Sequence, residues 1–318
     1  MKIRQRDLVL ITGAHGFLGQ HVLRTFLDET QCDLIVTGRD PKLKFTDIED
    51  EPRLLTYQPL DVTDRAAVKD AIGVFKPEVI VHCAGMVNVD LAEHEREMAW
   101  KANVRSVEYL LESARKSDAR IVHISSDYIF DGLRTPYAEN AAPNPLNYYG
   151  RTKLASENAL RSSGVNHCII RAAFFYGVEV HQKPSFAINV IKSLMKNEPF
   201  EAFDDLYASP TLIDDIALAV IRAVEYKKNG IFHIGGPEMI SRYEFARRIA
   251  AAFRLNTSLI VPVPFSSETR ANRPRHSSFI TLKAQTELGL RITGIDEGLQ
   301  VMLRGIHDME DTRQIVYQ

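Results

Sequence analysis

Residues 8–19, with the sequence LVLITGAHGFLG, decide the fold of this chain. The first four are a continuous apolar run, which is typical of a strand buried on both faces of a parallel sheet. Glycines follow at positions 13, 16 and 19, and apolar residues then recur at helical spacing through Leu27. In a strand, glycine turn and helix of this kind, small residues let the backbone approach a pyrophosphate at the helix N-terminus. The stretch therefore predicts a site for a dinucleotide cofactor.

The same alternation of strand and helix patterns continues to residue 171. Further buried strands are expected at 34–37, 54–57, 79–84, 121–125 and 169–171. The helices between them include a long one at about 93–114 and one that contains Tyr149. Such alternation indicates a parallel sheet with right-handed crossovers and helices on both faces. The predicted fold class is a Rossmann-type doubly wound α/β sheet.

Beyond residue 171 the alternation becomes irregular. Helices are expected at about 185–197 and 214–225, and a strand at 231–234 that could rejoin the sheet. Ser241 and Glu244 form a capping box for a helix to about residue 253, and two short helices close the chain. We predict an NAD(P)-binding domain at 1–172, which 209–235 rejoins. A smaller, partly interleaved substrate-binding domain takes 173–208 and 236–318.

The composition is that of an ordinary globular protein. The chain has 318 residues, of which 45% are hydrophobic and 25% charged, and a formal net charge of -2. So small a charge gives no overall field that favours nucleic acid or a membrane surface. No apolar run approaches the roughly 20 residues of a membrane span, and the first strand is too short for a signal peptide. Three cysteines without a C-x-x-C pair favour buried thiols in the reducing cytoplasm.

The catalytic prediction depends on Ser126, Tyr149 and Lys153. The tyrosine and the lysine stand four apart in YGRTK, so in a helix they share one face. An ammonium near a phenol favours the phenolate and lowers the phenol's pKa. A serine hydroxyl at the end of the strand at 121–125 could hydrogen-bond the oxygen that receives the proton. Together the three residues predict a general-acid site for a carbonyl group.

The cofactor prediction is NADP, with NAD possible. Arg39 follows the second strand, where an arginine suits a 2′-phosphate and an acid suits a free 2′-hydroxyl. The neighbouring Asp40 therefore keeps NAD open. Ala84 and Gly85 are small enough to let a cofactor lie close to the strand ends. Asn103 is polar among apolar neighbours and is a candidate for fixing the active-site lysine through water.

Several stretches together resemble the extended branch of the short-chain dehydrogenase/reductases, and within it the dTDP-4-dehydrorhamnose reductases. They are TGAHGFLG (12–19), VNVDLAE (87–93), SSDYIFDG (125–132), PLNYYGRTKLASE (145–157), SPTLIDDIA (209–217) and RPRHSSF (273–279). They are spread over nearly the whole chain. The resemblance implies an NADPH-dependent reduction of the 4-keto group of a nucleotide-linked deoxysugar.

The resemblance also implies a role for each matching residue. Tyr149 would be the proton donor, Lys153 would lower its pKa and hold the nicotinamide ribose, and Ser126 would orient the keto oxygen. The implied cofactor site consists of Gly13, His15, Gly16, Phe17, Leu18, Gly19, Arg39, Asp61, Val62, Ala84, Gly85, Met86, Asn103, Tyr149 and Lys153. The implied substrate site consists of Val89, Asp90, Ser126, Phe174 and Arg273.

Two positions depart from the family pattern near the expected substrate. Phe174 stands where a tryptophan is common, and His276 where an asparagine is usual, so the identity of the sugar is left open. Arg270, Arg273 and Arg275 cluster in one loop, as a diphosphate substrate requires, because guanidinium groups pair with phosphate oxygens.

Other functions remain as alternatives. The regulatory beta subunit of methionine adenosyltransferase resembles the same reductases, so a non-catalytic NADP-binding subunit is one, and a sugar-nucleotide epimerase is another. A dehydratase is disfavoured because Asp127-Tyr128 stands where that branch has Asp-Glu. No H-E-x-x-H or G-x-S-x-G motif suggests a metal site or a serine hydrolase. Dimers are common in the superfamily, so a homodimer is considered, although no helix marks an interface.

Overall fold

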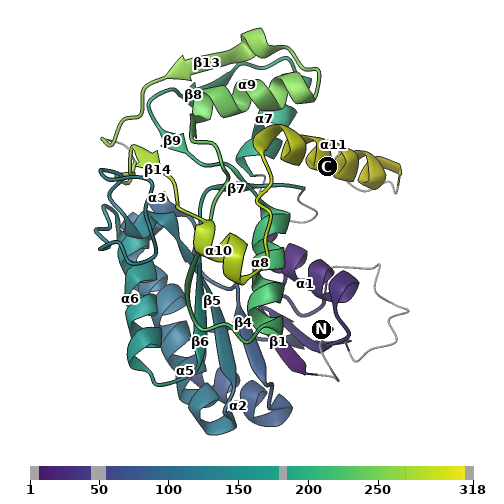
Figure 1. The fold of residues 1–318 in the computed structure, drawn as a ribbon, viewed down its shortest axis with the longest axis vertical. Coiled ribbons are helices and arrows are strands. Elements are labelled where there is room, and N and C mark those ends of the chain that lie inside the picture. Colours follow the sequence, from purple (N-terminus) through teal and green to yellow (C-terminus); the bar gives the residue numbers. More distant parts are fainter. Residues whose placement is uncertain (1–6, 44–54, 179–184, 269, 312–318) are drawn as a thin grey trace.

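The computed structural model describes residues 7–43, 55–178, 185–268 and 270–311 (Figure 1). Leu54, the first residue of the expected third strand, lies outside these ranges. Among the described helices, none is both long and apolar enough to cross a membrane.

A sheet of seven parallel strands forms the larger part of the molecule. Its order is β11-β6-β5-β4-β1-β2-β3. The strands are β1 (Leu8–Thr12), β2 (Asp33–Gly38), β3 (Leu55–Pro59), β4 (Val79–His82), β5 (Arg120–Ser126), β6 (His167–Ala172) and β11 (Gly230–Ile234). The direction of strand order reverses between β1 and β4, where ligands of open α/β sheets bind. The Rossmann-type fold class is confirmed, and β11 rejoins the sheet beside β6 as expected.

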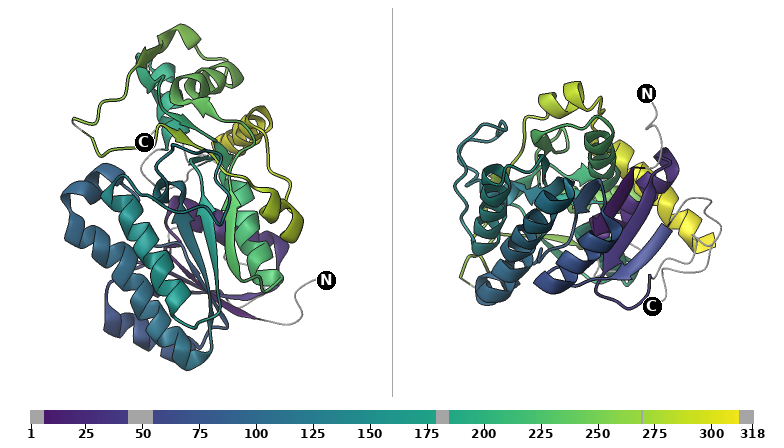
Figure 2. Two further views of the ribbon diagram at one scale, coloured as in Figure 1. Left: turned by 60° about the vertical axis from the view of Figure 1, so that its left-hand side comes forward. Right: turned by 90° about the horizontal axis from the view of Figure 1, so that it is seen from below.

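Helices cover both faces of the sheet (Figures 1 and 2). One face carries α1 (Phe17–Glu29), α8 (Ile213–Glu225) and α10 (Leu282–Glu287), and the other carries α2 (Arg65–Phe75), α5 (Ser106–Ser117) and α6 (Tyr148–Ser162). Successive residues of β1 alternate between the two cores: Val9 and Ile11 face α1 and α8, while Leu10 faces α2 and α5. The apolar run in the sequence is continuous because both faces are buried.

The long helix expected at about 93–114 is wrong in detail. The chain forms α3 (Val89–His94), α4 (Arg96–Trp100), a π-helical turn at Lys101–Arg105 and then α5. Helix α3 begins early because the Asn88 side chain caps it, accepting from Leu91 N at 3.0 Å. Glu95 then departs from helical backbone, with φ -102 and ψ 59, and separates α3 from α4. The π turn carries Asn103, and such turns are frequent at functional sites.

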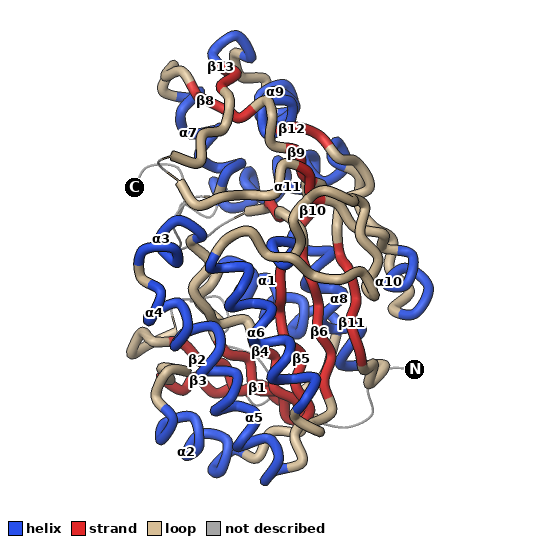
Figure 3. Tube along the Cα trace, turned by 90° about the vertical axis from the view of Figure 1, so that its left-hand side faces the viewer, coloured by secondary structure: helices blue, strands red, loops and turns tan. Residues whose placement is uncertain are grey.

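A smaller unit lies beyond the carboxyl ends of the central strands (Figure 3). Its core forms between α7 (Phe186–Met195), α9 (Arg242–Ala252) and α11 (Ile295–Asp311), around Phe245 and Leu299. The predicted cap is confirmed, because Ser241 Oγ accepts from Glu244 N at 3.0 Å. With 17 residues, α11 is not the short closing helix that was expected. The division into two domains stays a prediction, and within the C-terminal segment α10 packs on the sheet.

The smaller unit also contains short strands that tie distant segments together. They are β7 (Phe175–Tyr176), β8 (Phe200–Phe203), β9 (Tyr207–Ala208), β10 (Thr211–Leu212), β12 (Ile240–Ser241), β13 (Ile260–Val263) and β14 (His276–Ser277). Strand β9 lies between β12 and β14. This small sheet places residues near 276 beside the end of β5, where the candidate catalytic residues begin.

Candidate active site

The glycine turn between β1 and α1 packs against the end of β4. Gly13 has φ +70, and a Cβ at this residue would lie 2.8 Å from the backbone of Ala84. A Cβ at Gly19 would lie 2.1 Å from Gly13 O. Gly16 N closes the turn by donating to Gly13 O at 2.8 Å. Two of the predicted cofactor residues, Gly13 and Gly19, thus have no space for a side chain, so their backbone can come close to a ligand.

The ends of β2 and β3 bring the predicted adenosine residues together. Arg39 is exposed, directly after β2. Burial opposes ionisation of Asp61, but hydrogen bonds from Thr63 and the charge of Arg39 lower its pKa. His15 Nδ1 lies 3.7 Å from the carboxylate of Asp40. An exposed arginine over this edge is the arrangement that suits a 2′-phosphate.

The other predicted cofactor residues lie along the first helix and the third strand's end. Leu18 is buried in the core below the turn, and Val62 is buried beside β3. The Phe17 ring packs 5.7 Å from that of Phe175, centroid to centroid. Leu18 and Phe17 therefore pack the start of α1 against its neighbours.

Asn103 connects the end of β4 to helix α6. Its Oδ1 accepts from Met86 N at 2.8 Å, and its Nδ2 donates to Met86 O at 3.0 Å and to Thr152 Oγ1 at 2.9 Å. A Cβ at Gly85 would lie 2.8 Å from the same Oδ1. The side chain therefore fixes the loop after β4 and the residue next to Lys153. Its contact with that lysine through water stays a prediction.

The predicted catalytic residues come together at the end of β5 and the start of α6. Ser126 is the last residue of β5, and its hydroxyl lies close enough to the Tyr149 phenol to oppose the rise of that phenol's pKa. Lys153 Nζ donates to Ile124 O at 2.5 Å, so it lies beneath the same strand end. All three side chains are buried. Helix α6 is positioned by Asn147, whose side chain caps it by accepting from Gly150 N at 2.8 Å.

The pKa shifts of Tyr149 and Lys153 differ from what the sequence predicted. Burial raises the pKa of Tyr149, with Asp127 and Tyr128 adding to the effect and Ser126 opposing it. Burial lowers the pKa of Lys153 to about 8, against the attraction of Glu157. The expected lowering of the tyrosine's pKa is therefore wrong in direction, because desolvation dominates and the ammonium donates to the Ile124 carbonyl.

Four further residues belong to the site and were not predicted: Asp127, Tyr128, Arg242 and Ser277. The Tyr128 ring lies 6.0 Å from that of Tyr149, edge to face. Buried Asp127 accepts from Ser126 Oγ at 2.9 Å and from Ser277 Oγ, yet burial raises its pKa. Asp127 and Tyr128 directly follow Ser126, so their position was a usable signal. Arg242 and Ser277 lie more than 100 residues beyond Ser126 in the chain, although Ser277 stands in RPRHSSF, one of the stretches that resemble the family.

The C-terminal loop reaches the site through an ion pair. Arg273 Nη2 donates to Asp90 Oδ2 at 2.8 Å, and Ala271 N donates to Asp90 Oδ1 at 2.9 Å. This contact joins two predicted substrate residues that are 183 positions apart. Val89, beside Asp90, packs against Tyr149.

The other predicted arginines of this loop are also engaged. Arg275 pairs with Asp205, and the guanidinium of Arg270 lies 4.9 Å over the ring of Phe203. The predicted substrate residue Phe174 lies under the guanidinium of Arg242. Among the described residues, no group of three or more His, Cys, Asp or Glu side chains could hold a metal ion.

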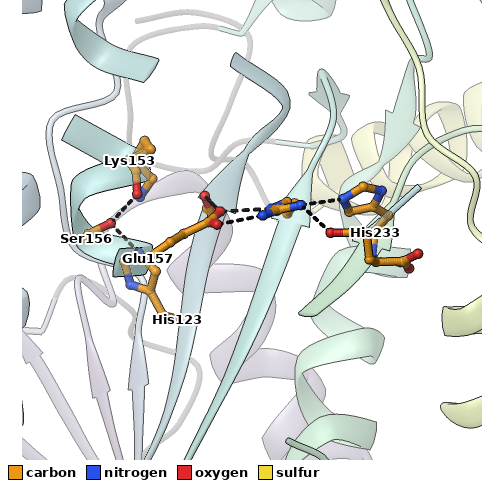
Figure 4. A network of polar contacts seen from close by, with 8 residues as sticks. His123, Lys153, Ser156, Glu157 and His233 are labelled. Atoms are coloured by element: carbon orange, nitrogen blue, oxygen red, sulfur yellow. Dashed lines mark hydrogen bonds and ion pairs between the residues drawn. The ribbon is translucent and has the colours of Figure 1, made fainter. Parts of the chain in front are cut away.

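A buried polar network lies beside helix α6, which contributes Glu157 to it (Figure 4). Glu157 and Arg171, which are 0% and 2% exposed, form two hydrogen bonds of 2.9 and 2.7 Å. Ser125 Oγ donates to Glu157 at 2.5 Å, and Arg171 Nη1 donates to His233 Nε2 at 3.1 Å. The network joins α6 to β5, β6 and β11, so the helix that carries Tyr149 is held to three strands.

Comparisons with known proteins place this chain in a family. A family model described as the RmlD substrate binding domain matches residues 7–307. Methionine adenosyltransferase 2 subunit beta of Mus musculus is 33% identical over 302 residues, which cover 92% of this chain and 86% of that protein. The dTDP-4-dehydrorhamnose reductase of Aggregatibacter actinomycetemcomitans is 28% identical over 300 residues, which cover 89% and 94%.

A solved structure gives a further comparison. The dTDP-4-dehydrorhamnose reductase of Bacillus anthracis in complex with NADP has a TM-score of 0.80 to this chain and covers 95% of it. All of that chain is covered, at 24% identity. This likeness shows a common fold.

Proposed function

This chain belongs to the RmlD substrate binding domain family, and we propose that it reduces the 4-keto group of a nucleotide-linked deoxysugar with NADPH. The observation that carries the proposal is the meeting of Ser126, Tyr149 and Lys153 at the carboxyl ends of the strands, next to the glycine turn. That placement puts a proton donor beside a site for a hydride donor. The relative named dTDP-4-dehydrorhamnose reductase supports this reaction class.

The chain's residues fit a dinucleotide. Gly13 and Gly19 cannot accept a Cβ without a clash, and the adjacent α1 N-terminus favours a phosphate. Arg39 would pair with a 2′-phosphate, and the B. anthracis reductase was solved with NADP. When bound, the reduced nicotinamide supplies the hydride that the keto carbon accepts.

The protein's own side chains would control the proton. The Tyr149 phenol is protonated at neutral pH, because burial raises its pKa, so it can donate to the keto oxygen as the carbon is reduced. Ser126 would hydrogen-bond the same oxygen and hold it within reach of the phenol. Lys153 would hold the ribose and favour the tyrosinate left after the transfer. Asp90, Val89, Phe174 and Arg273 would bind the nucleotide-sugar, with the smaller unit as the substrate-binding domain.

The test is turnover of dTDP-4-dehydrorhamnose, followed as NADPH oxidation at 340 nm. Tyr149→Phe removes the proton donor and should lower kcat by at least about 100-fold. Tyr148→Phe is the matched control, because it makes the same chemical change one residue away and should keep activity. Unchanged turnover in Tyr149→Phe would sink the mechanism.

A second candidate is a non-catalytic regulatory subunit that binds NADP. It is favoured by the 33% identity to methionine adenosyltransferase 2 subunit beta over 92% of this chain. This function predicts NADP binding without turnover on any keto-sugar nucleotide, together with co-elution with a methionine adenosyltransferase catalytic subunit. An epimerase would instead interconvert sugar nucleotides with no net NADPH consumption.

A further inference from the structure

Arg242 is a charged residue in the site that the proposed reaction does not yet use. It is the first residue of α9, in the smaller unit. Its guanidinium carbon lies 3.0 Å above the centre of the Phe174 ring and 5.8 Å from that of Phe186. Stacking on aromatic rings holds the planar head in one orientation while its N–H groups point outward.

The Arg242 guanidinium lies close to Asp127 and Tyr128, which follow Ser126 in the chain. The Tyr128 phenol lies close enough to Arg242 to favour the charged form of the guanidinium, and the Tyr128 ring contacts that of Tyr149. The Nη1 atom of Arg242 is buried and makes no hydrogen bond in the part of the chain that the structure describes. An orphaned donor on a cation is costly, so its presence in a native site calls for an explanation.

The acids around Arg242 are already engaged elsewhere. Asp127 accepts from Ser126 and Ser277, and burial raises its pKa, which weakens it as a counter-charge. Asp90 pairs with Arg273, a second cation that repels Arg242. Burial lowers the pKa of Arg242 only to about 10, so it stays charged at neutral pH. Around Tyr128 the positive charge of the arginines therefore exceeds the negative charge of the nearby carboxylates.

We propose that Arg242 binds substrate directly, with Nη1 donating to an anionic oxygen of the nucleotide-sugar near Tyr128. The inference rests on the proposed function in that it takes this site as the nucleotide-sugar site. The diphosphate carries anionic oxygens in every nucleotide-sugar, including the deoxysugar substrate of the proposed reaction, whereas a carboxylate on the sugar is present only when the sugar is a uronic acid. In either case Arg242 adds a charge-assisted hydrogen bond to the substrate contacts of Phe174 and Arg273.

The experiment measures binding by isothermal titration calorimetry with NADP present, so it needs no turnover. The probes are UDP-glucuronic acid, UDP-glucose and UDP. Arg242→Met keeps the volume over Phe174 and removes the charge. We expect it to weaken binding about 10- to 100-fold, as loss of a hydrogen bond to a charged group does.

The set of probes whose binding weakens in Arg242→Met identifies the substrate oxygen that Arg242 contacts. If the sugar carboxylate is bound, only UDP-glucuronic acid binding weakens; if the diphosphate is bound, all three weaken equally. Arg247→Met is the control, because Arg247 is exposed on the same helix and pairs with Glu244 at 3.8 Å. It should leave every Kd unchanged. Arg242→Lys restores a charge and should recover part of the affinity, and it serves where the Met variant fails to fold.

Arg242 variants with unchanged melting and NADP affinity, and with every Kd within about twofold of wild type, would overturn the inference. An Arg242→Met enzyme that reduces the keto-sugar with the wild-type KM would also overturn it and leave the reductase proposal standing. A wild-type protein that binds the probes through Arg242 without reducing any keto-sugar would overturn only the reductase proposal.

Discussion

Lys153 is held where its charge is costly. Its side chain is buried, and its ammonium has a backbone carbonyl, that of Ile124, within 2.5 Å. Glu157 attracts the charge but is already bound to Arg171 and Ser125. Burial dominates and lowers the lysine's pKa to about 8. The charge of Lys153, which the proposed reaction needs, therefore lowers the stability of the folded protein.

The first prediction is that Lys153→Met makes the protein more stable and less active at pH 7. A pKa that falls from 10.5 to about 8 corresponds to about 3 kcal/mol. Below pH 8 the lysine is protonated in both the folded and the unfolded chain, so the cost is complete. Above pH 8 only the unfolded chain keeps the proton, up to about pH 10.5, so the wild-type protein recovers stability as the pH rises.

Urea unfolding of both proteins between pH 6.5 and 10 checks this prediction. The advantage of the Met variant should be constant below about pH 8 and should shrink steadily above it. A variant that is less stable than wild type at pH 7 would contradict it. Activity should fall regardless, because Lys153 is placed in the catalytic site.

Some residues of the candidate site have a partner nearby in the sequence, and others have their partners far away in the sequence. Tyr149 and Lys153 are four apart on one helix, and Ser126 ends a recognisable strand, so these were predicted. Arg242 and Ser277 enter the site through tertiary packing, and nothing next to Arg242 in the sequence indicates it, whereas Ser277 lies in RPRHSSF, one of the stretches that resemble the family. The direction of the Tyr149 pKa shift was also missed, because burial is a property of the folded chain.

Helix α6 makes a close approach to the short 3-10 turn at Asp127–Ile129. A Cβ added at Gly150 would lie 2.1 Å from Tyr128 O and 2.9 Å from Tyr128 C. Only a residue without a side chain allows the helix and the turn to touch. This contact sets how near Tyr149 lies to Ser126 and Tyr128.

We therefore expect Gly150→Ala to push α6 away from the turn. Stability should fall by about 1 to 3 kcal/mol, as overpacking does, and kcat by at least about tenfold. Gly73→Ala in α2 is the matched control, since nothing lies within 4 Å of its Cβ. It should gain up to about 1 kcal/mol, because alanine is the better helix former, and keep its kcat. Urea unfolding and NADPH oxidation measure both, and equal effects of the two substitutions would refute the argument.

Helices and strands were predicted well where their burial leaves a single, clear pattern of apolar residues in the sequence. Strands β1, β2, β4, β5 and β6 were recognisable because apolar runs buried on both faces leave no alternation to misread. The segment at 89–117 was not, because the break at Glu95 and the π turn around Asn103 are imposed by contacts with β4 and α6. The length of α11 was missed as well, although its apolar residues, among them Leu299 and Met302, join the core of the smaller unit.

The whole molecule places part of its predicted cofactor residues and part of its predicted substrate residues on different segments. The glycine turn, Arg39 and Asp61 lie at one half of the sheet's carboxyl edge, formed by β1, β2 and β3. Phe174, Arg242 and Arg273 come from the segments that build the smaller unit. A ligand of either half should therefore stabilise the folded chain without the other.

This arrangement gives a prediction about melting. NADP at 100 times its Kd should stabilise the protein by about 2.7 kcal/mol, which raises Tm by several degrees. Arg39→Ala should reduce the shift with NADP and leave the smaller shift with NAD unchanged, because only the 2′-phosphate meets the guanidinium. Arg24→Ala, a substitution of another arginine in the same half, is the control. Equal losses with NADP and NAD in Arg39→Ala would argue against NADP recognition by this residue.

The ion pair between Asp90 and Arg273, and the bond from Ser277 to Asp127, have a consequence for synthesis on the ribosome. The last strand of the sheet, β11, is complete at Ile234, so a nascent chain of about 270 residues contains every strand and the glycine turn. Domains fold from the N-terminus as they are made. Such a chain has Asp90 and Asp127 in place but lacks both of their C-terminal partners. The predicted cofactor residues are thus in place before Arg273 and Ser277 join the predicted substrate site.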